Sequence, residues 1–349
     1  MRQPLITIDA DVLGRQRTGD ETYVENLLRE LGGLAPEFRL AAVTRRPELV
    51  PAGIEPVDLP ARRQPWRMAV SLPILLRRLH PELGHFLYVI PPLYRGQAVV
   101  TVQDLSFERH PELMSPRDRF YFRTFVRRSV RRAARVLTGS EQTRRDLVDR
   151  YGLAPGRVVV TPYGLDPVYG PEGPAPENGE YALFVGGLEL RKDPVAALEA
   201  IALVNEDLRL ILAGPARRGH KAVRSAVRRL GLEQRVELRG HVSKEELAGL
   251  YRGAACLVFP SRYEGFGLPL IEAMASGAPV VATTAGSVPE IAGDAAILVE
   301  PGDPPALADG IERALADRAR LRAAGFERAR GFSWRATAAR TLDVYRELV

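Results

Sequence analysis

The most informative stretch of this chain runs Ser261-Arg262-Tyr263-Glu264-Gly265-Phe266-Gly267-Leu268-Pro269-Leu270-Ile271-Glu272-Ala273-Met274. The apolar residues 254–259 before it are typical of a buried strand, and residues 269–275 have the spacing of a helix with proline at its first position. A glycine loop therefore joins a strand to the start of a helix.

This loop has the composition of an anion-binding site. Gly265 and Gly267 permit backbone angles that other residues avoid, so the amides of Phe266, Gly267 and Leu268 can point outward together. They would do so at the positive end of the helix, where a phosphate or a sugar oxygen is stabilised. We therefore predict that Phe266, Gly267 and Leu268 bind a ligand of this kind.

Two carboxylates flank the loop. Glu264 lies within it, and Glu272 is predicted in the first turn of the helix. Acidic groups beside a phosphate repel it unless they bind hydroxyl groups instead. The combination favours a ligand with both phosphates and hydroxyls, such as a nucleotide sugar. The other interpretation of this spacing is a helix N-terminus with two solvated acids.

The pair also resembles a known family motif. Glu264 and Glu272, with seven residues between them around Gly-Phe-Gly-Leu-Pro, are similar to the paired glutamates of the retaining glycosyltransferases of family 4. The resemblance implies the GT-B fold, an α/β architecture in which two Rossmann-like, doubly wound domains face each other across a cleft. It also implies that Glu264 is catalytic and faces the transferred sugar, while Glu272 holds the ribose of the donor.

A basic pair follows the first strand signal of the C-terminal half. Residues 181–194 read as a strand, a glycine turn, then Arg191 and Lys192 before a helix. Two cations there can neutralise a diphosphate, Arg through its planar fork and Lys as a point charge. The run resembles the family's donor motif, which implies that Arg191, Lys192 and Gly187 serve the donor phosphates. Some members carry arginine where Gly187 stands, and the other interpretation of the run is a solvated turn.

The N-terminal half begins with a similar pattern. Residues 5–9 are predicted as a buried strand, and a glycine turn over residues 14–19 leads into an amphipathic helix. By resemblance, Gly19 approaches the diphosphate of the donor. Asp9-Ala10-Asp11 has the spacing of a metal-binding pair, but at the end of a first strand we interpret it as a turn and predict no required metal.

Three positions resemble the acceptor side of the family. Residues 99–107 match a strand end that usually carries His-Asp; here Gln103 replaces the histidine and Asp104 is kept. Glutamine can form hydrogen bonds but cannot carry a proton at neutral pH, so an imidazole role is excluded at this position. Residues 158–166 match a strand that leads to Pro-Asn-Gly-Val-Asp, with Tyr163 in place of the asparagine.

The alternation of strand and helix signals predicts parallel sheets covered on both faces. We expect an N-terminal acceptor-binding domain over residues 1–166, a proline- and glycine-rich linker over 167–180, a nucleotide-sugar-binding domain over 181–331, and a last helix over 332–349 that crosses back to the N-terminal domain. By resemblance, the loop at Val242 reads the nucleotide base through its backbone. His241 has no cysteine or acid at ligand spacing, so no zinc site is predicted.

The net charge of +6 is uneven, because the excess of basic residues lies in residues 1–165. A basic helix predicted over residues 117–135 is consistent with contact to an anionic membrane surface or with an ordinary outer helix that covers the sheet. No nucleic-acid-binding motif accompanies this charge. The single cysteine, Cys256, is expected in the core. Without an apparent signal or spanning segment, we expect a cytoplasmic protein, with peripheral contact to the inner face of the membrane as a further expectation.

Together with these patterns, the family resemblance implies a retaining hexosyltransferase of polysaccharide biosynthesis, for which we expect no cofactor or metal. Residues 185–192 look most like those of mannosyltransferases that use GDP-mannose, so this is the favoured donor, with a UDP-glucose-type donor as the alternative and a glycan or lipid-linked molecule as the acceptor. Because Gln103 and Tyr163 depart from the family pattern, one alternative is a protein that binds nucleotide sugars without turnover. A sugar-nucleotide epimerase on the same fold is a third possibility.

Overall fold

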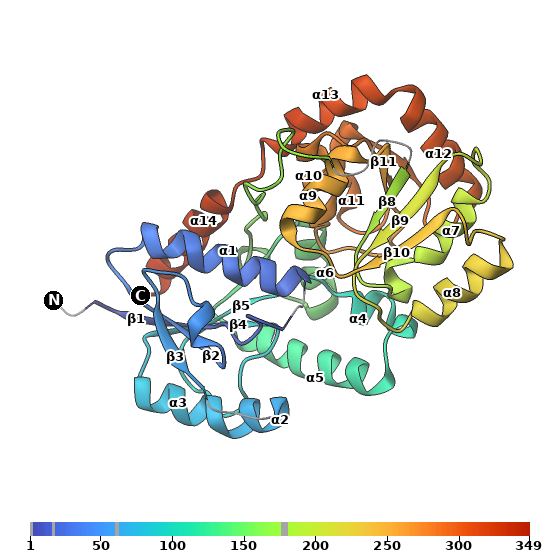
Figure 1. The fold of residues 1–349 in the computed structure, drawn as a ribbon. Coiled ribbons are helices and arrows are strands. Elements are labelled where there is room, and N and C mark those ends of the chain that lie inside the picture. The colour runs from blue at the N-terminus through green and yellow to red at the C-terminus, as the bar shows by residue number, and fades with distance from the viewer. Residues whose placement is uncertain (1–2, 16–17, 60–62, 176–180) are drawn as a thin grey trace. The chain divides into compact units, whose positions relative to one another are not determined.

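The computed structural model describes residues 3–15, 18–59, 63–175 and 181–349. The chain divides into two compact units, Met1–Gly164 with Ser333–Val349, and Leu165–Phe332 (Figure 1). Of the segments predicted above, residues 16–17 of the first glycine turn and residues 176–180 of the linker lie outside the described residues. Each unit contains one parallel sheet.

The first unit is built on a seven-stranded sheet in the order β3-β2-β1-β4-β5-β6-β7. Its strands are β1 (Leu5–Asp9), β2 (Arg39–Thr44), β3 (Glu55–Asp58), β4 (Leu83–Leu87), β5 (Ala98–Thr101), β6 (Arg135–Thr138) and β7 (Val158–Val160). The order reverses between β1 and β4, so this sheet is doubly wound, as predicted. Sequence reasoning missed β3, an edge strand that contains a proline and has no buried residue.

Helices cover both faces of this sheet, with α1 and α14 on one side and α3 and α5 on the other (Figure 1). They are α1 (Thr18–Leu34), α2 (Gln64–Trp66), α3 (Leu72–Leu79), α4 (Ser106–Arg109), α5 (Pro116–Arg132), α6 (Glu141–Tyr151) and α14 (Trp334–Leu348). A π-helical segment, Arg67–Ser71, lies between α2 and α3. The basic helix ends at Arg132, three residues earlier than predicted.

The last helix, α14, completes the first unit although it follows the whole second unit in sequence. The Tyr345 hydroxyl lies 2.6 Å from Nδ1 of His85, and the Thr337 hydroxyl donates to the carbonyl of Pro162 at 2.5 Å. Nε2 of His85 lies 2.7 Å from the Thr101 hydroxyl, so this histidine joins α14 to the middle of the sheet. All of these side chains except Pro162 are buried.

This buried histidine predicts an acid-sensitive fold. Burial lowers the pKa of His85 from 6.5 to about 3. Its contribution to stability is therefore complete above pH 6.5 and is lost as the pH falls from 6.5 toward 3, by up to about 1.4 kcal/mol per pH unit. Urea unfolding of the wild type and of His85→Gln at several pH values measures this loss. The free energy of unfolding of the variant should fall less steeply with acid, and equal slopes would contradict the assignment.

The second unit contains a six-stranded parallel sheet in the order β10-β9-β8-β11-β12-β13. The strands are β8 (Tyr181–Val185), β9 (Arg209–Ala213), β10 (Val236–Gly240), β11 (Cys256–Phe259), β12 (Val280–Thr283) and β13 (Ala296–Val299). The helices are α7 (Pro194–Ile201), α8 (His220–Arg229), α9 (Lys244–Gly253), α10 (Leu268–Ser276), α11 (Val288–Ala292), α12 (Pro304–Ala316) and α13 (Arg318–Ala329). The strand order reverses between β8 and β11.

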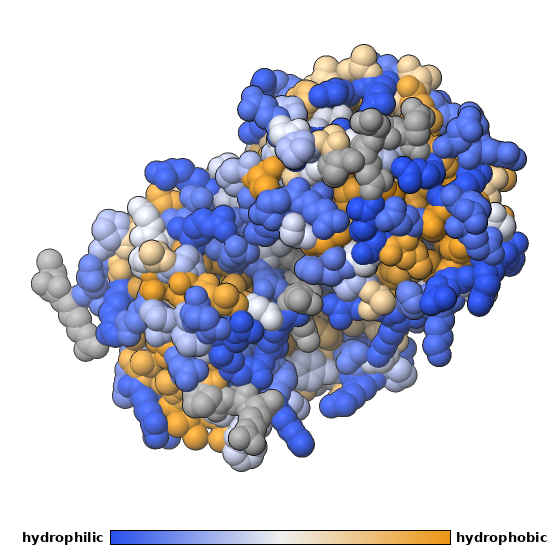
Figure 2. Space-filling view, in the orientation of Figure 1, coloured by the Kyte–Doolittle hydropathy of each residue, from blue (hydrophilic) through white to orange (hydrophobic). Residues whose placement is uncertain are grey.

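Central strands of the second unit are buried on both faces, which explains their continuous apolar sequence. Every residue of β8 and β11 is buried, and Cys256 is a core residue as predicted. Burial raises the pKa of the Cys256 thiol to about 12, so the thiol stays protonated. The visible surface of both units is mostly hydrophilic, with scattered apolar patches (Figure 2).

Candidate active site

The candidate site lies at the point where the strand order of the second unit reverses. In doubly wound sheets, ligands bind outside the carboxyl ends of the two strands that flank this point. Here those strands are β8, followed by the glycine turn at Gly186, and β11, followed by the loop at residues 260–267. Gly186 has a φ of +141°, which favours glycine. Gly214, after β9, also has to be glycine, because a β-carbon there would lie 2.0 Å from the carbonyl oxygen of Gly186.

Glu264 is the centre of an acid–cation cluster that consists of Glu264, Arg191, Lys192 and Ser261. Its Oε2 lies 3.0 Å from Nη1 of Arg191, and its Oε1 lies 3.2 Å from Nζ of Lys192. The Ser261 hydroxyl donates to the same Oε1 at 2.8 Å. Sequence reasoning assigned Glu264 and the two cations to opposite parts of a ligand, and the structure adds that they contact each other directly.

The cluster fixes the charge of Glu264. Burial by itself would raise the pKa of this carboxyl group, but the charges of Arg191 and Lys192 and the hydrogen bond from Ser261 together lower it to about 2. Glu264 is therefore ionised at any physiological pH. An ionised carboxylate cannot donate a proton, so this side chain is suited to orienting hydroxyl groups and cations rather than to acid catalysis.

The backbone around Glu264 is held from two sides. The Ser287 amide donates to the carbonyl of Glu264 at 3.0 Å, and the Arg191 guanidinium donates to the carbonyl of Tyr263 at 2.6 Å. Gly286 has a φ of +61°, and a β-carbon there would lie 2.3 Å from the Glu264 carbonyl oxygen. The amide of Arg262 donates to the carbonyl of Arg191 at 2.8 Å. The loops after β8 and β11 are thus tied together.

The glycine loop does end at a helix, as the sequence predicts. Gly267, with a φ of +95° that favours glycine, precedes the first residue of α10, Leu268, and Phe266 is buried beside it. The positive end of the α10 dipole therefore lies at the loop that carries Glu264. One expectation is wrong in detail: Glu272 is the fifth residue of α10 and does not lie in its first turn.

Glu272 has a different environment from Glu264. Its Oε2 accepts a hydrogen bond from the Tyr251 hydroxyl at 2.9 Å. Burial raises its pKa to about 7, with Asp166 raising it further and Lys244 and Lys192 lowering it. The two glutamates of the motif therefore titrate far apart, which is common where two carboxylates have separate roles.

Gly187 and Val242 complete the donor-side positions predicted from sequence. Beside Gly187, the stem of Arg217 fills the space where a side chain would lie, since its Cγ is 3.1 Å from a β-carbon built on the glycine. Val242 lies in the short connection between β10 and α9, just before Ser243, whose hydroxyl caps α9. Sequence reasoning missed Arg217, because nothing in its local spacing links it to a turn 30 residues earlier.

The remaining predicted residues belong to the first unit. Gly19 lies in the first turn of α1, and Oε1 of Gln103 is 3.8 Å from a β-carbon built on it, so the structure brings these two positions together. Nε2 of Gln103 is buried, and in the described part of the chain it has no hydrogen-bond partner. Asp104 accepts hydrogen bonds from the amide and hydroxyl of Ser106, at 2.9 and 2.8 Å, at the start of α4.

Tyr163 lies inside the first unit and is only 2% exposed. Its ring stacks on Trp334, with centroids 5.7 Å apart, and lies 5.0 Å from the ring of Tyr23. A β-carbon on Gly139 would lie 2.8 Å from the Tyr163 ring. The position that resembles an acceptor-side asparagine is thus filled here by a packed aromatic ring.

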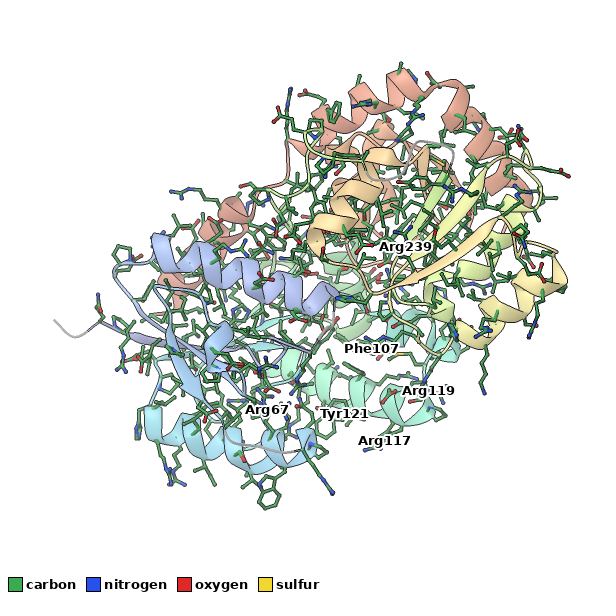
Figure 3. The ribbon with its side chains drawn as sticks, in the orientation of Figure 1. Arg67, Phe107, Arg117, Arg119, Tyr121 and Arg239 are labelled. Atoms are coloured by element: carbon green, nitrogen blue, oxygen red, sulfur yellow. The ribbon has the colours of Figure 1, made fainter. Side chains whose placement is uncertain are left out.

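The Asp-Ala-Asp sequence ends in a turn, as predicted. Asp9 is paired with the buried Arg67, and Asp11 is paired with Arg67 at 3.1 Å and with Arg45 at 2.7 Å. Figure 3 shows Arg67 and Tyr121 in the same region of this unit. The carboxylates of both aspartates are therefore paired with arginine side chains. In the ranges described, no group of three or more His, Cys, Asp or Glu side chains is arranged to hold a metal ion.

Comparison with known proteins agrees with this fold. Residues 17–169 match the family model "Glycosyltransferase Family 4", and residues 170–331 match "Glycosyl transferases group 1". The chain is 32% identical to the O-antigen chain mannosyltransferase B of Escherichia coli over 317 residues, which cover 82% of each chain. It is 35% identical to a D-inositol 3-phosphate glycosyltransferase of Kineococcus radiotolerans over 63% of this chain and 58% of that protein.

Solved structures show the same fold. A sucrose-phosphate synthase from Thermosynechococcus elongatus has a TM-score of 0.81 at 24% identity and covers 99% of both chains. The Anabaena protein HepE in complex with UDP-glucose has a TM-score of 0.76 at 17% identity, over 99% of this chain and 100% of that one. The fold is GT-B, and the chain belongs to the glycosyltransferases of family 4.

No helix within the described ranges combines the length and the apolar character that crossing a membrane requires.

Proposed function

We propose that this glycosyltransferase is a retaining enzyme that moves a hexose from a nucleotide-sugar donor to a glycan or lipid-linked acceptor, with GDP-mannose favoured over a UDP-glucose-type donor. The observation that carries the proposal is the acid–cation cluster beside the α10 N-terminus, at the strand ends where doubly wound sheets bind ligands. The similarity to a mannosyltransferase over 82% of each chain supports the mannosyl donor. The likeness to HepE with UDP-glucose keeps the alternative open.

The difficult step is breaking the bond between the anomeric carbon and the diphosphate, because negative charge develops on the leaving diphosphate. In this proposal Arg191 and Lys192, with side chains 20% and 14% exposed, stabilise this charge together with the α10 dipole. A phosphate that binds these cations competes with Glu264 for them. We expect Glu264 then to accept hydrogen bonds from the hydroxyls of the transferred sugar.

Retention of the anomeric configuration is proposed to proceed without a covalent enzyme intermediate. The bond from the anomeric carbon to the diphosphate oxygen breaks, and a bond from the same carbon to the acceptor hydroxyl oxygen forms on the same face. The acceptor proton passes to an oxygen of the departing phosphate. Glu264, ionised in its cluster, orients the sugar.

The proposal predicts a donor-dependent gain in stability and a defined product. A ligand that binds only the folded state raises the melting temperature by mass action, so GDP-mannose should give the largest shift, followed by UDP-glucose. Because charge neutralisation is assigned to Arg191 and Lys192, EDTA should leave donor turnover unchanged. NMR of the product should show the anomeric configuration of the donor. Inversion would refute the retaining mechanism. A requirement for added metal would refute the assignment of charge neutralisation to Arg191 and Lys192.

A binding protein without turnover remains the second candidate, because Gln103 replaces the family histidine and its amide is buried without a partner in the described ranges. Donor binding without transfer or donor hydrolysis would favour this candidate. Conversion of the donor to an epimer in the absence of acceptor would instead indicate the epimerase.

Peripheral contact with the cytoplasmic face of a membrane is proposed through α5. Val126 and Val130 of this helix are fully buried, so the helix covers the sheet, while Phe120 is 71% exposed. Arg117 and Arg119, labelled in Figure 3, lie on α5 with the exposed arginines Arg123, Arg127, Arg128, Arg131 and Arg132. A basic face with an exposed aromatic ring suits an anionic lipid surface.

This proposal predicts flotation with vesicles that contain phosphatidylglycerol but not with vesicles of phosphatidylcholine alone. Arg127→Glu with Arg128→Glu should weaken binding to these vesicles by about 30-fold or more, since each basic residue near such a surface contributes about 1 kcal/mol. Arg224→Glu, on an exposed face of α8 in the other unit, is the control. Equal flotation of all variants would refute the assignment to α5.

A further inference from the structure

Glu272 is held at one carboxylate oxygen only. The Tyr251 hydroxyl donates to Oε2 at 2.9 Å, and in the described part of the protein Oε1 has no hydrogen bond. The Tyr251 side chain is fully buried, so it has no access to solvent from which another proton acceptor could come. The direction of this hydrogen bond is fixed while Glu272 is ionised, because a carboxylate can only accept.

Tyr251 is itself fixed by its surroundings. It lies on α9, and the ring of Tyr169 packs edge-on against it with centroids 5.8 Å apart and planes at 76°. Tyr169 is 8% exposed. A tyrosine that is buried, packed on one ring and bonded at its hydroxyl has little rotational freedom, so it holds its acceptor in one orientation.

Three further charges face Glu272. Asp166 raises the pKa of this carboxyl group, whereas Lys244 and Lys192 lower it. Asp166 and Lys244 are themselves paired, with Nζ of Lys244 3.1 Å from Oδ2 of Asp166. Tyr251 acts in the same direction as the two lysines, since its hydrogen bond stabilises the ionised form. Burial is the largest influence on the pKa of Glu272 and raises it, and these named neighbours adjust it further.

We infer that Tyr251 is a positioning residue for Glu272, whose Oε2 it occupies so that Oε1 is presented to the vicinal hydroxyls of a nucleotide ribose. The inference rests on the proposed function, because it requires a nucleotide donor in this unit. It adds a residue from a separate helix to the site and assigns it a role through Glu272 rather than through direct contact with the donor.

Two substitutions test the inference, because they should shift the pH dependence of nucleotide binding in opposite directions. Only ionised Glu272 accepts two hydroxyl hydrogen bonds well, so the affinity for GDP or UDP should fall on the acid side of the Glu272 titration. Tyr251→Phe removes a stabilising hydrogen bond and should move this acid limb to higher pH by about one unit, which is about a tenfold loss of affinity well below pH 7 and about a fivefold loss at pH 7. Asp166→Asn removes a repelling charge and should move the limb to lower pH.

The matched control is Tyr181→Phe. This tyrosine is fully buried in the same unit and its hydroxyl donates to the carbonyl of Leu250 at 2.7 Å, but it makes no bond to Glu272. Its removal should cost stability without moving the pH dependence of nucleotide binding. Circular dichroism and the melting temperature of each variant would show that it is folded.

Calorimetric titration of each variant with GDP and with UDP between pH 5.5 and 9 provides the measurement. Opposite shifts of the acid limb support the inference. Equal loss of affinity at every pH, or a shift in the same direction for both variants, would overturn it. If the folded wild type binds neither nucleotide, the proposed function fails and the ribose role with it. An NMR titration of Glu272 in the free protein would separately show whether Tyr251 controls its ionisation.

Discussion

Replacing Lys192 by alanine should lower kcat about 10²- to 10³-fold, because the substitution removes a preorganised cation from the place where charge develops on the leaving diphosphate. Nζ of Lys192 lies 3.2 Å from Glu264, and the side chain is only 14% exposed, so solvent cannot replace it well. Initial rates of transfer from the best donor, at saturating donor and acceptor, measure the effect.

Lys221→Ala is the control, since Lys221 is an exposed lysine at the start of α8. It should retain wild-type kcat. A Lys192→Ala protein that is folded and transfers sugar within threefold of the wild type would show that the diphosphate is stabilised elsewhere.

Glu264→Gln should abolish most of the transfer while leaving nucleotide binding intact. The change keeps the shape of the side chain but removes the charge that Arg191 and Lys192 neutralise in the free protein. Without it, both cations are available to a diphosphate, so GDP or UDP should bind as tightly as in the wild type or more tightly. Loss of the group that orients the transferred sugar should lower kcat about 100-fold or more.

Calorimetry with GDP and UDP, combined with transfer rates, separates these two effects. If Glu264→Gln loses nucleotide affinity and kcat in the same proportion, Glu264 is part of the nucleotide pocket and does not act on the sugar. A melting temperature close to that of the wild type is the condition for this comparison, because removing one partner of a buried ion pair costs about 3–5 kcal/mol in some proteins.

Much of the fold could be predicted because its signals are local. A buried strand, a glycine turn and a capped helix each depend on residues within about ten positions, and their repetition indicates parallel, doubly wound sheets. The paired glutamates and the basic pair were recognisable for the same reason. β3 was missed because an edge strand with Pro56 has neither a buried face nor an apolar run.

The contacts within the site could not be predicted from local pattern. Glu264 and Arg191 are 73 residues apart, and only the neighbouring positions of β8 and β11 in the sheet bring them together. The hydrogen bond from Tyr251 to Glu272 likewise joins two helices. Spacing along the chain could not show that Glu264 would be held by the cations assigned to the diphosphate.

Tyr163 shows a second limit of pattern matching. By position it resembles an acceptor-side residue, yet in the structure its ring packs against Tyr23 and Trp334, and Trp334 comes from the last helix of the chain. A family position can keep its place in the fold while its side chain takes on a packing role. Only the tertiary structure shows whether such a side chain faces a ligand or packs inside the protein.

The most direct test of the central claim is a crystal structure of the protein with GDP or UDP bound. The acid–cation cluster predicts that the diphosphate lies within hydrogen-bond distance of Arg191 and Lys192 and that a ribose hydroxyl contacts Glu272. A nucleotide bound with its phosphates out of reach of both cations would contradict the assignment of this site.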